Sequence, residues 1–285
     1  MAFAERTYSA GDGLGLYYRD YAPEPGVPGK IPVLCLPGLT RNSKDFHVPA
    51  ERLQKIGHRV ICPDYRGRGR SAYDPNPDNY RMETYVSDVR HLLCALNLHR
   101  VAVIGTSMGG ILAMAMAAAI PTYLAGVVLN DIGWIVPAKG VEPIIQSLKY
   151  EKVFASWVEA RDALRRGFPD LPADTDDEWM ELTQATFIEG QDGGIHRDWD
   201  GRIVIPIEKL PPGDTDLRIY FRALANIPTG VVRGAKSHIL TPAILSDMAA
   251  AREDLIHATV TGVGHPPNLK EQLAKEVIDA VLARI

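Results

Sequence analysis

Cysteine is scarce in this sequence, and its three residues follow neither a disulfide nor a metal-binding pattern. Cys35, Cys62 and Cys94 are odd in number, lie in apolar runs and lack the short spacings of a metal site. We therefore expect reduced thiols in the core, no metal site and no cysteine nucleophile.

Long apolar runs and an excess of basic residues are also absent. No stretch approaches the roughly 18 to 20 apolar residues of a membrane span, and the first residues lack a charged segment followed by an apolar one. The formal net charge is -4, and the densest basic cluster, Arg66 to Arg70, alternates with glycine in an expected loop. These observations predict a soluble cytoplasmic protein that binds neither membranes nor nucleic acid.

Apolar residues are abundant enough for a large core, because 46% of the 285 residues are hydrophobic. Residues 3–9 and 14–21 are expected to form an opening hairpin. Short apolar stretches then alternate with stretches of helical periodicity, which is typical of a parallel sheet flanked by helices. The expected strands are 31–36, 59–62, 101–104, 124–129, 229–233 and 255–260, and the expected helices are 45–56, 82–96, 108–120, 242–251 and one from 270.

This alternation is interrupted after Asp131. From Trp134 to about Leu210 the pattern predicts three helices, near 141–149, 151–166 and 175–188, then a Gly/Asp-rich turn and a short apolar stretch at 203–207. All four tryptophans fall here, where they predict either a small core or the wall of an apolar pocket. We expect a core of residues 1–133 and 211–285 and an inserted helical cap of residues 134–210.

One segment, residues 101–119, places a serine between a β-branched run and an alanine-rich helical run. Ser107 is flanked by Gly105 and Gly109 in the pattern Gly-x-Ser-x-Gly. A serine on a tight strand-to-helix turn takes a positive φ, which requires small residues two positions before and after it. The pattern therefore predicts a nucleophile elbow with Ser107 as the nucleophile.

A serine nucleophile needs a general base, because the hydroxyl is a weak nucleophile at its own pKa. His265 follows the last expected strand, at the end of the sheet where ligands bind open α/β folds. The remaining histidines mostly fall within expected helices, turns or strands. His265 is therefore the candidate base.

Taken together, these segments resemble the α/β-hydrolase fold family, in its branch with a helical cap. The resemblance rests on Leu36-Pro-Gly-Leu39, Asp64-Tyr-Arg-Gly-Arg-Gly-Arg-Ser71, Gly105-Thr-Ser-Met-Gly-Gly110 and Gly262-Val-Gly-His265. It implies a mostly parallel central sheet flanked by helices, and an oxyanion hole formed by the backbone N–H groups of Leu39 and Met108. Pro37-Gly38 stands where the family usually has His-Gly, a change expected to alter loop packing more than chemistry.

The acidic member of the expected triad departs from the family pattern. Relatives of this type commonly carry Ser-Asp after the seventh strand, but the aligned pair here is Ser237-His238. Asp131, directly after the sixth expected strand, is the alternative place for the acid in this fold. We expect Asp131 to be the acid, since the histidine needs a carboxylate to fix its tautomer. A turn-capping role for Asp131 stays open, as does Asp247 as a weaker alternative acid.

The residues predict hydrolysis of a carboxylic ester or lactone through an acyl-enzyme. A C–C bond or enol-lactone hydrolase of aromatic degradation is one alternative. A catalytically impaired homologue that binds a small molecule is another. Arg41, Trp134 and His238 are candidate substrate contacts. We expect no cofactor and a small-molecule ester or lactone as the partner, and a homodimer stays open.

Overall fold

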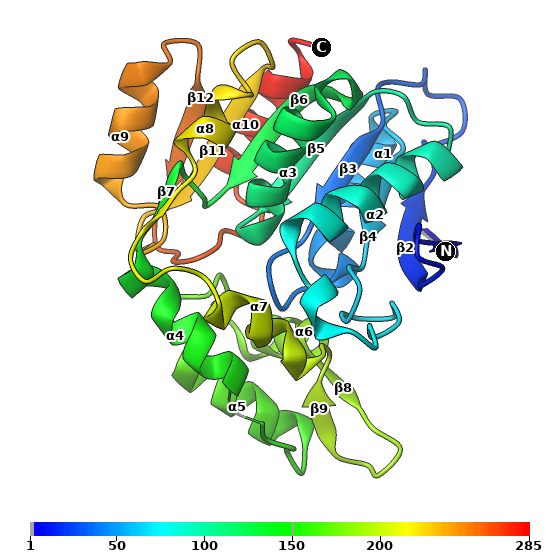
Figure 1. Ribbon diagram of the computed structural model, residues 1–285, viewed down its shortest axis with the longest axis vertical. Coiled ribbons are helices and arrows are strands. Elements are labelled where there is room, and N and C mark those ends of the chain that lie inside the picture. The colour runs from blue at the N-terminus through cyan, green and yellow to red at the C-terminus, as the bar shows by residue number, and fades with distance from the viewer. Residues whose placement is uncertain (1–2, 150) are drawn as a thin grey trace.

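The computed structural model describes residues 3–149 and 151–285. Its central element is an eight-stranded sheet with the order β1-β2-β4-β3-β5-β6-β11-β12 (Figure 1). The first three of these strands pair antiparallel and the remaining pairs are parallel. The strands are β1 (Ala4–Ser9), β2 (Gly15–Tyr21), β3 (Val33–Leu36), β4 (Val60–Pro63), β5 (Val101–Thr106), β6 (Leu124–Asn130), β11 (Thr229–Gly234) and β12 (Ile256–Val260).

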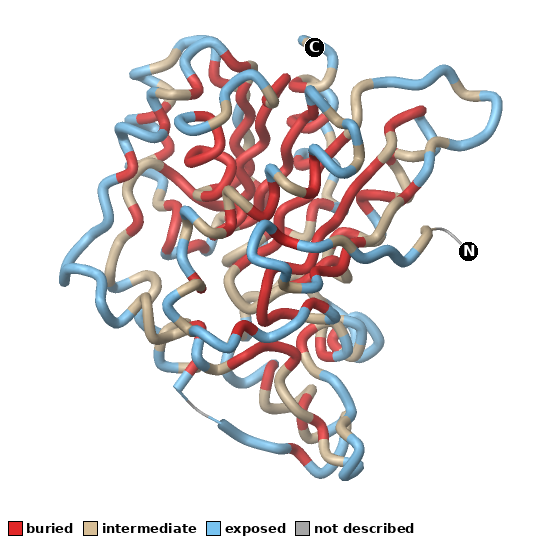
Figure 2. The backbone as a smooth tube through the Cα atoms, turned by 45° about the vertical axis from the view of Figure 1, so that its right-hand side comes forward, coloured by how far each residue is buried: buried red, intermediate tan, exposed pale blue. Residues whose placement is uncertain are grey.

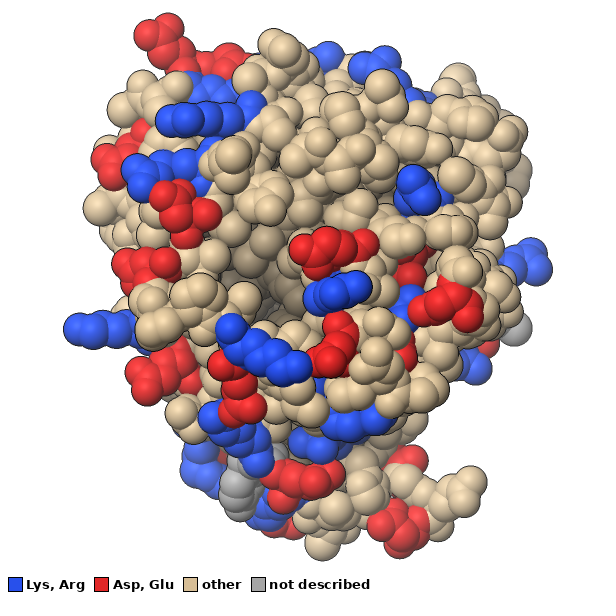
Figure 3. All heavy atoms as spheres, in the orientation of Figure 1, with Lys and Arg blue, Asp and Glu red and all other residues tan. Residues whose placement is uncertain are grey.

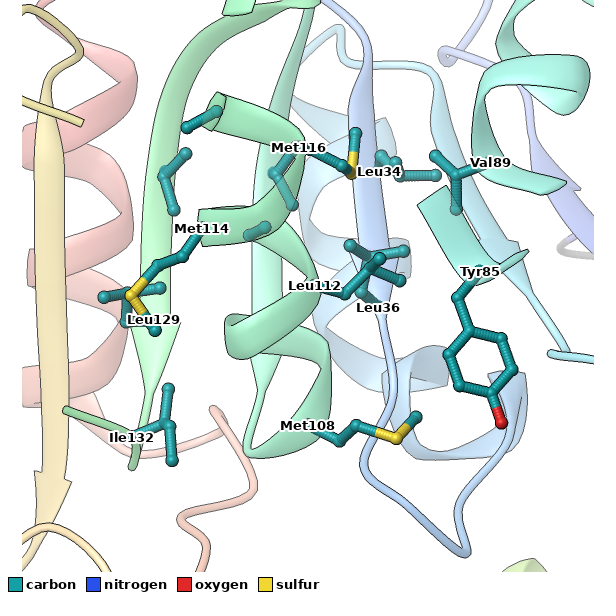
Figure 4. Close-up of a cluster of buried hydrophobic side chains, with 14 of the residues drawn as sticks. Leu34, Leu36, Tyr85, Val89, Met108, Leu112, Met114, Met116, Leu129 and Ile132 are labelled. Carbon is teal, nitrogen blue, oxygen red and sulfur yellow. The ribbon is translucent and has the colours of Figure 1, made fainter. Parts of the chain in front are cut away.

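Helices cover both faces of this sheet, which explains why its inner strands are apolar without alternation. In β3, Leu34 and Leu36 contribute to one hydrophobic cluster, whereas Val33 and Cys35 contribute to the other. Figure 4 shows α3 packed over Leu34 and Leu36. The helices of this part are α1 (His47–Lys55), α2 (Met82–Ala95), α3 (Met108–Ala119), α8 (Arg218–Arg222), α9 (Pro242–Ala251) and α10 (Gln272–Leu282), with 3-10 turns η1 (Ser43–Phe46), η2 (Pro77–Asn79) and η3 (Pro121–Tyr123).

Buried residues concentrate in the central strands and the helix faces against them (Figure 2). Cys35 and Cys62 lie in this core as expected, but Cys94 is exposed. The reason is helical geometry, since Leu92 and Leu93 take the buried side of α2 and turn position 94 outward. No helix in the described ranges has both the length and the apolar character required to cross a bilayer.

A further group of elements lies beyond the carboxyl ends of the parallel strands (Figure 1). We call residues 134–210 the inserted segment. It contains β7 (Ile135–Val136), α4 (Ala138–Lys149), α5 (Trp157–Gly167), α6 (Asp176–Thr186), β8 (Phe187–Glu189), β9 (Ile195–Arg197), η4 (Gly201–Ile203) and α7 (Val204–Glu208). After it, β10 (Thr215–Asp216) pairs antiparallel with β7, so the chain leaves the segment beside the place where it entered.

The inserted segment differs from the sequence prediction in two places. The helix expected over 151–166 begins only at Trp157, because Phe154 forms a β-bridge with Ile195 and Ser156 caps the helix. The helix expected over 175–188 ends at Thr186, where the chain enters the antiparallel pair of β8 and β9. Long-range strand pairing therefore overrides local helical periodicity before α5 and after α6.

The basic cluster at 66–70 is a structural loop with a buried ion network. The Arg66 guanidinium is 1% exposed and contacts Asp88 in two places, at 2.8 and 2.6 Å, as well as Asp12 and Asp74. These contacts join the first hairpin, the loop after β4 and helix α2. On the face drawn in Figure 3, Lys and Arg side chains are interspersed with Asp and Glu.

Removing this arginine should destabilise the fold. Arg66→Ala is expected to lower the free energy of unfolding by about 3 to 5 kcal/mol, because it leaves buried carboxylates without a counter-charge. Arg70→Ala is the matched control: Arg70 pairs with Glu5 at the surface, where such pairs contribute about 0 to 1 kcal/mol. Urea unfolding measures both, and equal effects would contradict a stabilising role for the buried network.

Candidate active site

The predicted elbow is present where β5 passes into α3. Ser107 lies between the two elements with φ 52° and ψ -115°, a region that residues with a Cβ rarely adopt. A Cβ on Gly105 would collide with the carbonyl oxygen of Gly109, and a Cβ on Gly109 would collide with that of Leu36. The two glycines are therefore required by close backbone approach, and the turn presents the serine at the carboxyl end of the sheet.

Ser107 begins a continuous series of hydrogen bonds. Its Oγ lies 2.9 Å from His265 Nε2, and His265 Nδ1 lies 2.8 Å from Asp131 Oδ2. The second carboxylate oxygen of Asp131 accepts the backbone N–H of Gly234 at 2.9 Å. Because the carboxylate can only accept, it places the proton on Nδ1 and leaves Nε2 free to accept the serine proton.

Asp131 is held rigidly for this contact. Its side chain has no exposed surface, and its backbone has a φ of 57°. Its N–H donates to the carbonyl oxygen of Val232 at 2.8 Å, which ties the end of β6 to β11. The structure thus brings together the three residues predicted as nucleophile, base and acid. Asp247, the weaker alternative acid, is exposed on α9.

Asn130 is a site residue that the sequence analysis missed. It is buried, and its Nδ2 donates to Thr106 Oγ1 at 3.1 Å and to the carbonyl oxygen of Pro267 at 2.9 Å. Its own carbonyl oxygen accepts the backbone N–H of Ser107 at 2.9 Å. Asn130 therefore joins the serine turn to the loop that carries His265. The sequence feature that could have indicated Asn130 is its position immediately before Asp131, at the carboxyl end of a buried strand.

The two amides predicted for an oxyanion hole lie on segments that adjoin Ser107. Met108 is the first residue of α3, where backbone N–H groups lack helical partners. Leu39 follows Gly38, and a Cβ built on that glycine would lie 3.9 Å from Ser107 Cβ. Within the described residues, neither the Leu39 nor the Met108 N–H donates a hydrogen bond to a protein group. Both amides are thus available to a developing negative charge.

Ser107 and His265 line a cavity of about 890 Å³ between the core and the inserted segment. This volume is suitable for a small organic molecule. Apolar side chains from both parts line it, among them Leu39, Phe46, Leu164, Phe168, Phe187 and Trp199. No group of three or more His, Cys, Asp or Glu side chains in the described ranges is arranged to hold a metal ion.

Arg41, a predicted substrate contact, lines this cavity but is engaged by the protein. Its Nε and Nη2 donate to the two carboxylate oxygens of Asp45 at 2.8 and 2.6 Å, and its Nη1 donates to Thr186 Oγ1. Although burial alone would lower the pKa of Arg41, the Asp45 carboxylate raises it. The side chain therefore connects the loop after Leu39 to the end of α6, and the Asp45 carboxylate already occupies the Nε–Nη2 edge of its fork.

Neighbouring residues strengthen this connection between the loop and the inserted segment. Asn42 Nδ2 donates to the carbonyl oxygen of Ala185 at 3.2 Å and to Asp198 Oδ2 at 3.1 Å. Lys44 Nζ donates to the same Asp198 oxygen at 2.8 Å and to the carbonyl oxygen of Gln184 at 2.9 Å. The loop that carries the Leu39 amide is thus anchored on the inserted segment.

The structure does not bring the other two predicted substrate contacts to the cavity. Trp134 packs edge to face on Phe221, with ring centroids 5.4 Å apart. His238 is exposed in the loop after β11. Neither belongs to the cavity lining, so these two expectations are corrected. Trp134 serves the hydrophobic core, and position 238 points to solvent.

A central parallel sheet with a serine turn after β5 and a histidine loop after β12 defines a hydrolase of the α/β class. Residues 31–271 match the family described as the alpha/beta hydrolase fold. The chain therefore belongs to the alpha/beta hydrolase family, which confirms the predicted fold. Its relatives include enzymes named as hydrolases, lipases and esterases, and the chain is an α/β-hydrolase enzyme.

Three similar proteins match over most of the chain. The 3-hydroxybutyrate-oligomer hydrolase of Cupriavidus necator is 33% identical over 253 residues, which cover 85% of each chain. The crystal structure of an alpha/beta hydrolase from Novosphingobium aromaticivorans has a TM-score of 0.90 and 37% identity, and covers 100% of this chain and 99% of that one. E-2-(acetamidomethylene)succinate hydrolase has a TM-score of 0.80 at 21% identity, with 99% and 98% covered, and shares the fold.

The backbone strain at Ser107 can be measured directly. Ser107→Gly should be about 1 kcal/mol more stable than Ser107→Ala, since glycine adopts φ 52° without the cost that a Cβ imposes. Ser147, inside α4, is the control position, where the order should reverse because glycine weakens a regular helix by about 1 kcal/mol relative to alanine. Urea unfolding compares the four variants, and the same order at both positions would refute strain at the turn.

Proposed function

We propose that the chain is a serine hydrolase of carboxylic esters or lactones. Ser107 is the nucleophile, His265 the general base and Asp131 the acid. The observation that carries this proposal is the series of hydrogen bonds from Asp131 through His265 to Ser107, with both contacts below 3.0 Å, on the wall of a cavity. This arrangement activates a hydroxyl for attack on a carbonyl carbon.

The reaction follows from these positions. His265 Nε2 takes the Ser107 proton as Oγ attacks the carbonyl, and the Leu39 and Met108 amides stabilise the oxyanion, each contributing about 10²- to 10³-fold in rate. His265 then gives the proton to the departing alcohol, which leaves an acyl-enzyme. Water, deprotonated by His265, hydrolyses this intermediate. Asp131 keeps the Nδ1 proton in place and stabilises the imidazolium in both steps.

The inserted segment is proposed to act as a cap over this chemistry. Side chains of α5 and α6 and of the β8–β9 pair line the cavity together with residues of the core. Aromatic residues of the segment, including Phe168, Phe187 and Trp199, supply apolar surface for the acyl or alcohol part of a substrate. A cap formed by 134–210 would therefore select substrates while the core supplies the reaction.

Among the bonds that a serine hydrolase can cleave, we propose an ester as the bond cleaved by this chain. The relative with 33% identity over 85% of the chain is named for hydrolysis of 3-hydroxybutyrate oligomers, which are linked by ester bonds. The complete series of hydrogen bonds also argues against a catalytically impaired binding protein.

Substitution of the acid tests this proposal. Asp131→Asn is expected to lower kcat by about 10⁴-fold, because an amide at this position favours the wrong histidine tautomer. His238→Ala, at the position where relatives commonly carry the acid, should leave kcat unchanged, since this side chain is exposed and takes no part in the hydrogen bonds that join Asp131, His265 and Ser107. The hydrolysis of p-nitrophenyl butyrate provides the measurement.

Two results would contradict this assignment. Equal, small losses in Asp131→Asn and His238→Ala would remove Asp131 from the triad. Turnover that survives in Ser107→Ala would exclude the acyl-enzyme, and Ser107 should also be the residue labelled by a fluorophosphonate.

A further inference from the structure

The wall of the cavity differs in charge from the protein as a whole. Of the described residues that line it, seven are lysine or arginine and three are aspartate or glutamate. The whole chain, in contrast, has a formal net charge of -4. Basic side chains are therefore concentrated around the cavity, and an anionic ligand would be attracted there.

Most of these cations are already neutralised by carboxylates. Lys44 pairs with Asp198 at 2.8 Å, and Arg41 pairs with Asp45 at 2.6 Å. The remaining close pairs are Lys152 with Glu159 at 2.7 Å and Arg197 with Glu151 at 2.9 Å. Arg19 lies over the ring of Phe3, at 4.4 Å from its centroid.

Arg166 and Lys270 differ from this group. Within the described part of the chain, Arg166 forms no ion pair within 4.0 Å, although the pKa of the Glu159 carboxyl is lowered by its hydrogen bond from Lys152 and, to a smaller extent, by the Arg166 charge. Lys270 Nζ approaches Glu181 only at 3.6 Å, and Glu178 also faces it from α6. The Glu178 carboxylate is engaged in the capping box of α6. Among the described residues, Arg19 also lacks a carboxylate partner, but it lies on β2 and stacks on Phe3. On the inserted segment, Arg166 is thus a cation of the cavity wall that a ligand can bind without displacing an ion-pair partner, with Lys270 as a second, partly offset charge.

Both cations lie on segments next to the histidine loop. Arg166 is in the last turn of α5, and the chain just after that helix contacts the loop from Gly264 to Lys270. The Gly264 N–H donates to the carbonyl oxygen of Asp170 at 2.7 Å, and Asn268 Nδ2 donates to that of Pro172 at 3.2 Å. The two basic residues therefore approach the cavity from the side of His265, which protonates the departing alcohol.

We propose that the cavity selects esters whose alcohol part carries a free carboxylate, bound by Arg166 with help from Lys270. This deepens the proposed ester hydrolysis and rests on it. Short linear oligomers of hydroxy acids have this chemistry, since each ends in one carboxylate and is joined by esters. An arginine fork matches a carboxylate with two parallel hydrogen bonds, whereas a neutral ester would leave it without a partner.

A pair of substrates that differ only in charge tests this selection. One is the linear dimer of 3-hydroxybutyrate, and the other is the same dimer with its terminal carboxylate converted to a primary amide. Both present the same scissile ester. The wild type should hydrolyse the acid with a kcat/KM about tenfold above that of the amide, the effect of one charge-assisted contact at a partly exposed site. The preference should shrink in 0.5 M NaCl.

Arg166→Gln should bring this ratio close to one by lowering kcat/KM for the acid. Arg165→Gln is the matched control, because Arg165 is exposed on the same turn but pairs with Asp176, stacks on Trp179 and is not part of the cavity lining. It should keep the preference for the acid. Far-ultraviolet circular dichroism verifies that both variants are folded.

The inference fails if the wild type treats acid and amide alike, or if both variants lower the ratio equally. In either case, the proposed ester hydrolysis would still stand if the wild type cleaves the ester of the amidated dimer and Ser107→Ala does not. Absence of Ser107-dependent hydrolysis with both dimers and with p-nitrophenyl butyrate would overturn both proposals.

Discussion

The arrangement of the site depends on one buried carboxylate. Asp131 has no exposed surface, and a carboxylate in such a place is unfavourable unless donors satisfy it. The donors come from distant parts of the chain, the N–H of Gly234 and the ring of His265, which are 103 and 134 residues away. The Asp131 carboxylate therefore receives both hydrogen bonds only when β11 has paired with β6 and the histidine loop is in place. The fold and the geometry of the site are mutually dependent.

A second dependence links the inserted segment to the loop after Leu39. Asn42 and Lys44 hold the loop after Leu39 on Asp198, and Arg41 adds its contact with Thr186. Movement of α6 or of the chain near Asp198 would thus reach the Leu39 amide through a short path of polar contacts. In the proposed mechanism, substrate selection by the inserted segment and stabilisation of the oxyanion by the Leu39 amide would consequently be coupled through this loop.

Local signals in the sequence were sufficient for the core, and they indicated three side chains that the structure brings together, Ser107, His265 and Asp131. The glycines around Ser107 and the strand before Asp131 encode their own geometry within a few residues. The alternation of strands and helices predicted a parallel sheet, and the resemblance to the family implied the α/β-hydrolase fold, which is confirmed. The inserted segment was predicted less well, since the bridge between Phe154 and Ile195 depends on residues far apart in the chain. Arg41 illustrates a different limit, because only tertiary structure reveals that Asp45 and Thr186 already occupy it.

The pairing of β7 with β10 has a consequence for how such an enzyme can change. The chain enters the inserted segment through Ile135 and Val136 and returns through Thr215 and Asp216, directly beside them. Two ends that lie side by side can be joined by a short or a long stretch without moving the strands below. Insertions, deletions or replacement of the inserted segment can therefore be accommodated without displacing the strands that precede Ser107 and Asp131.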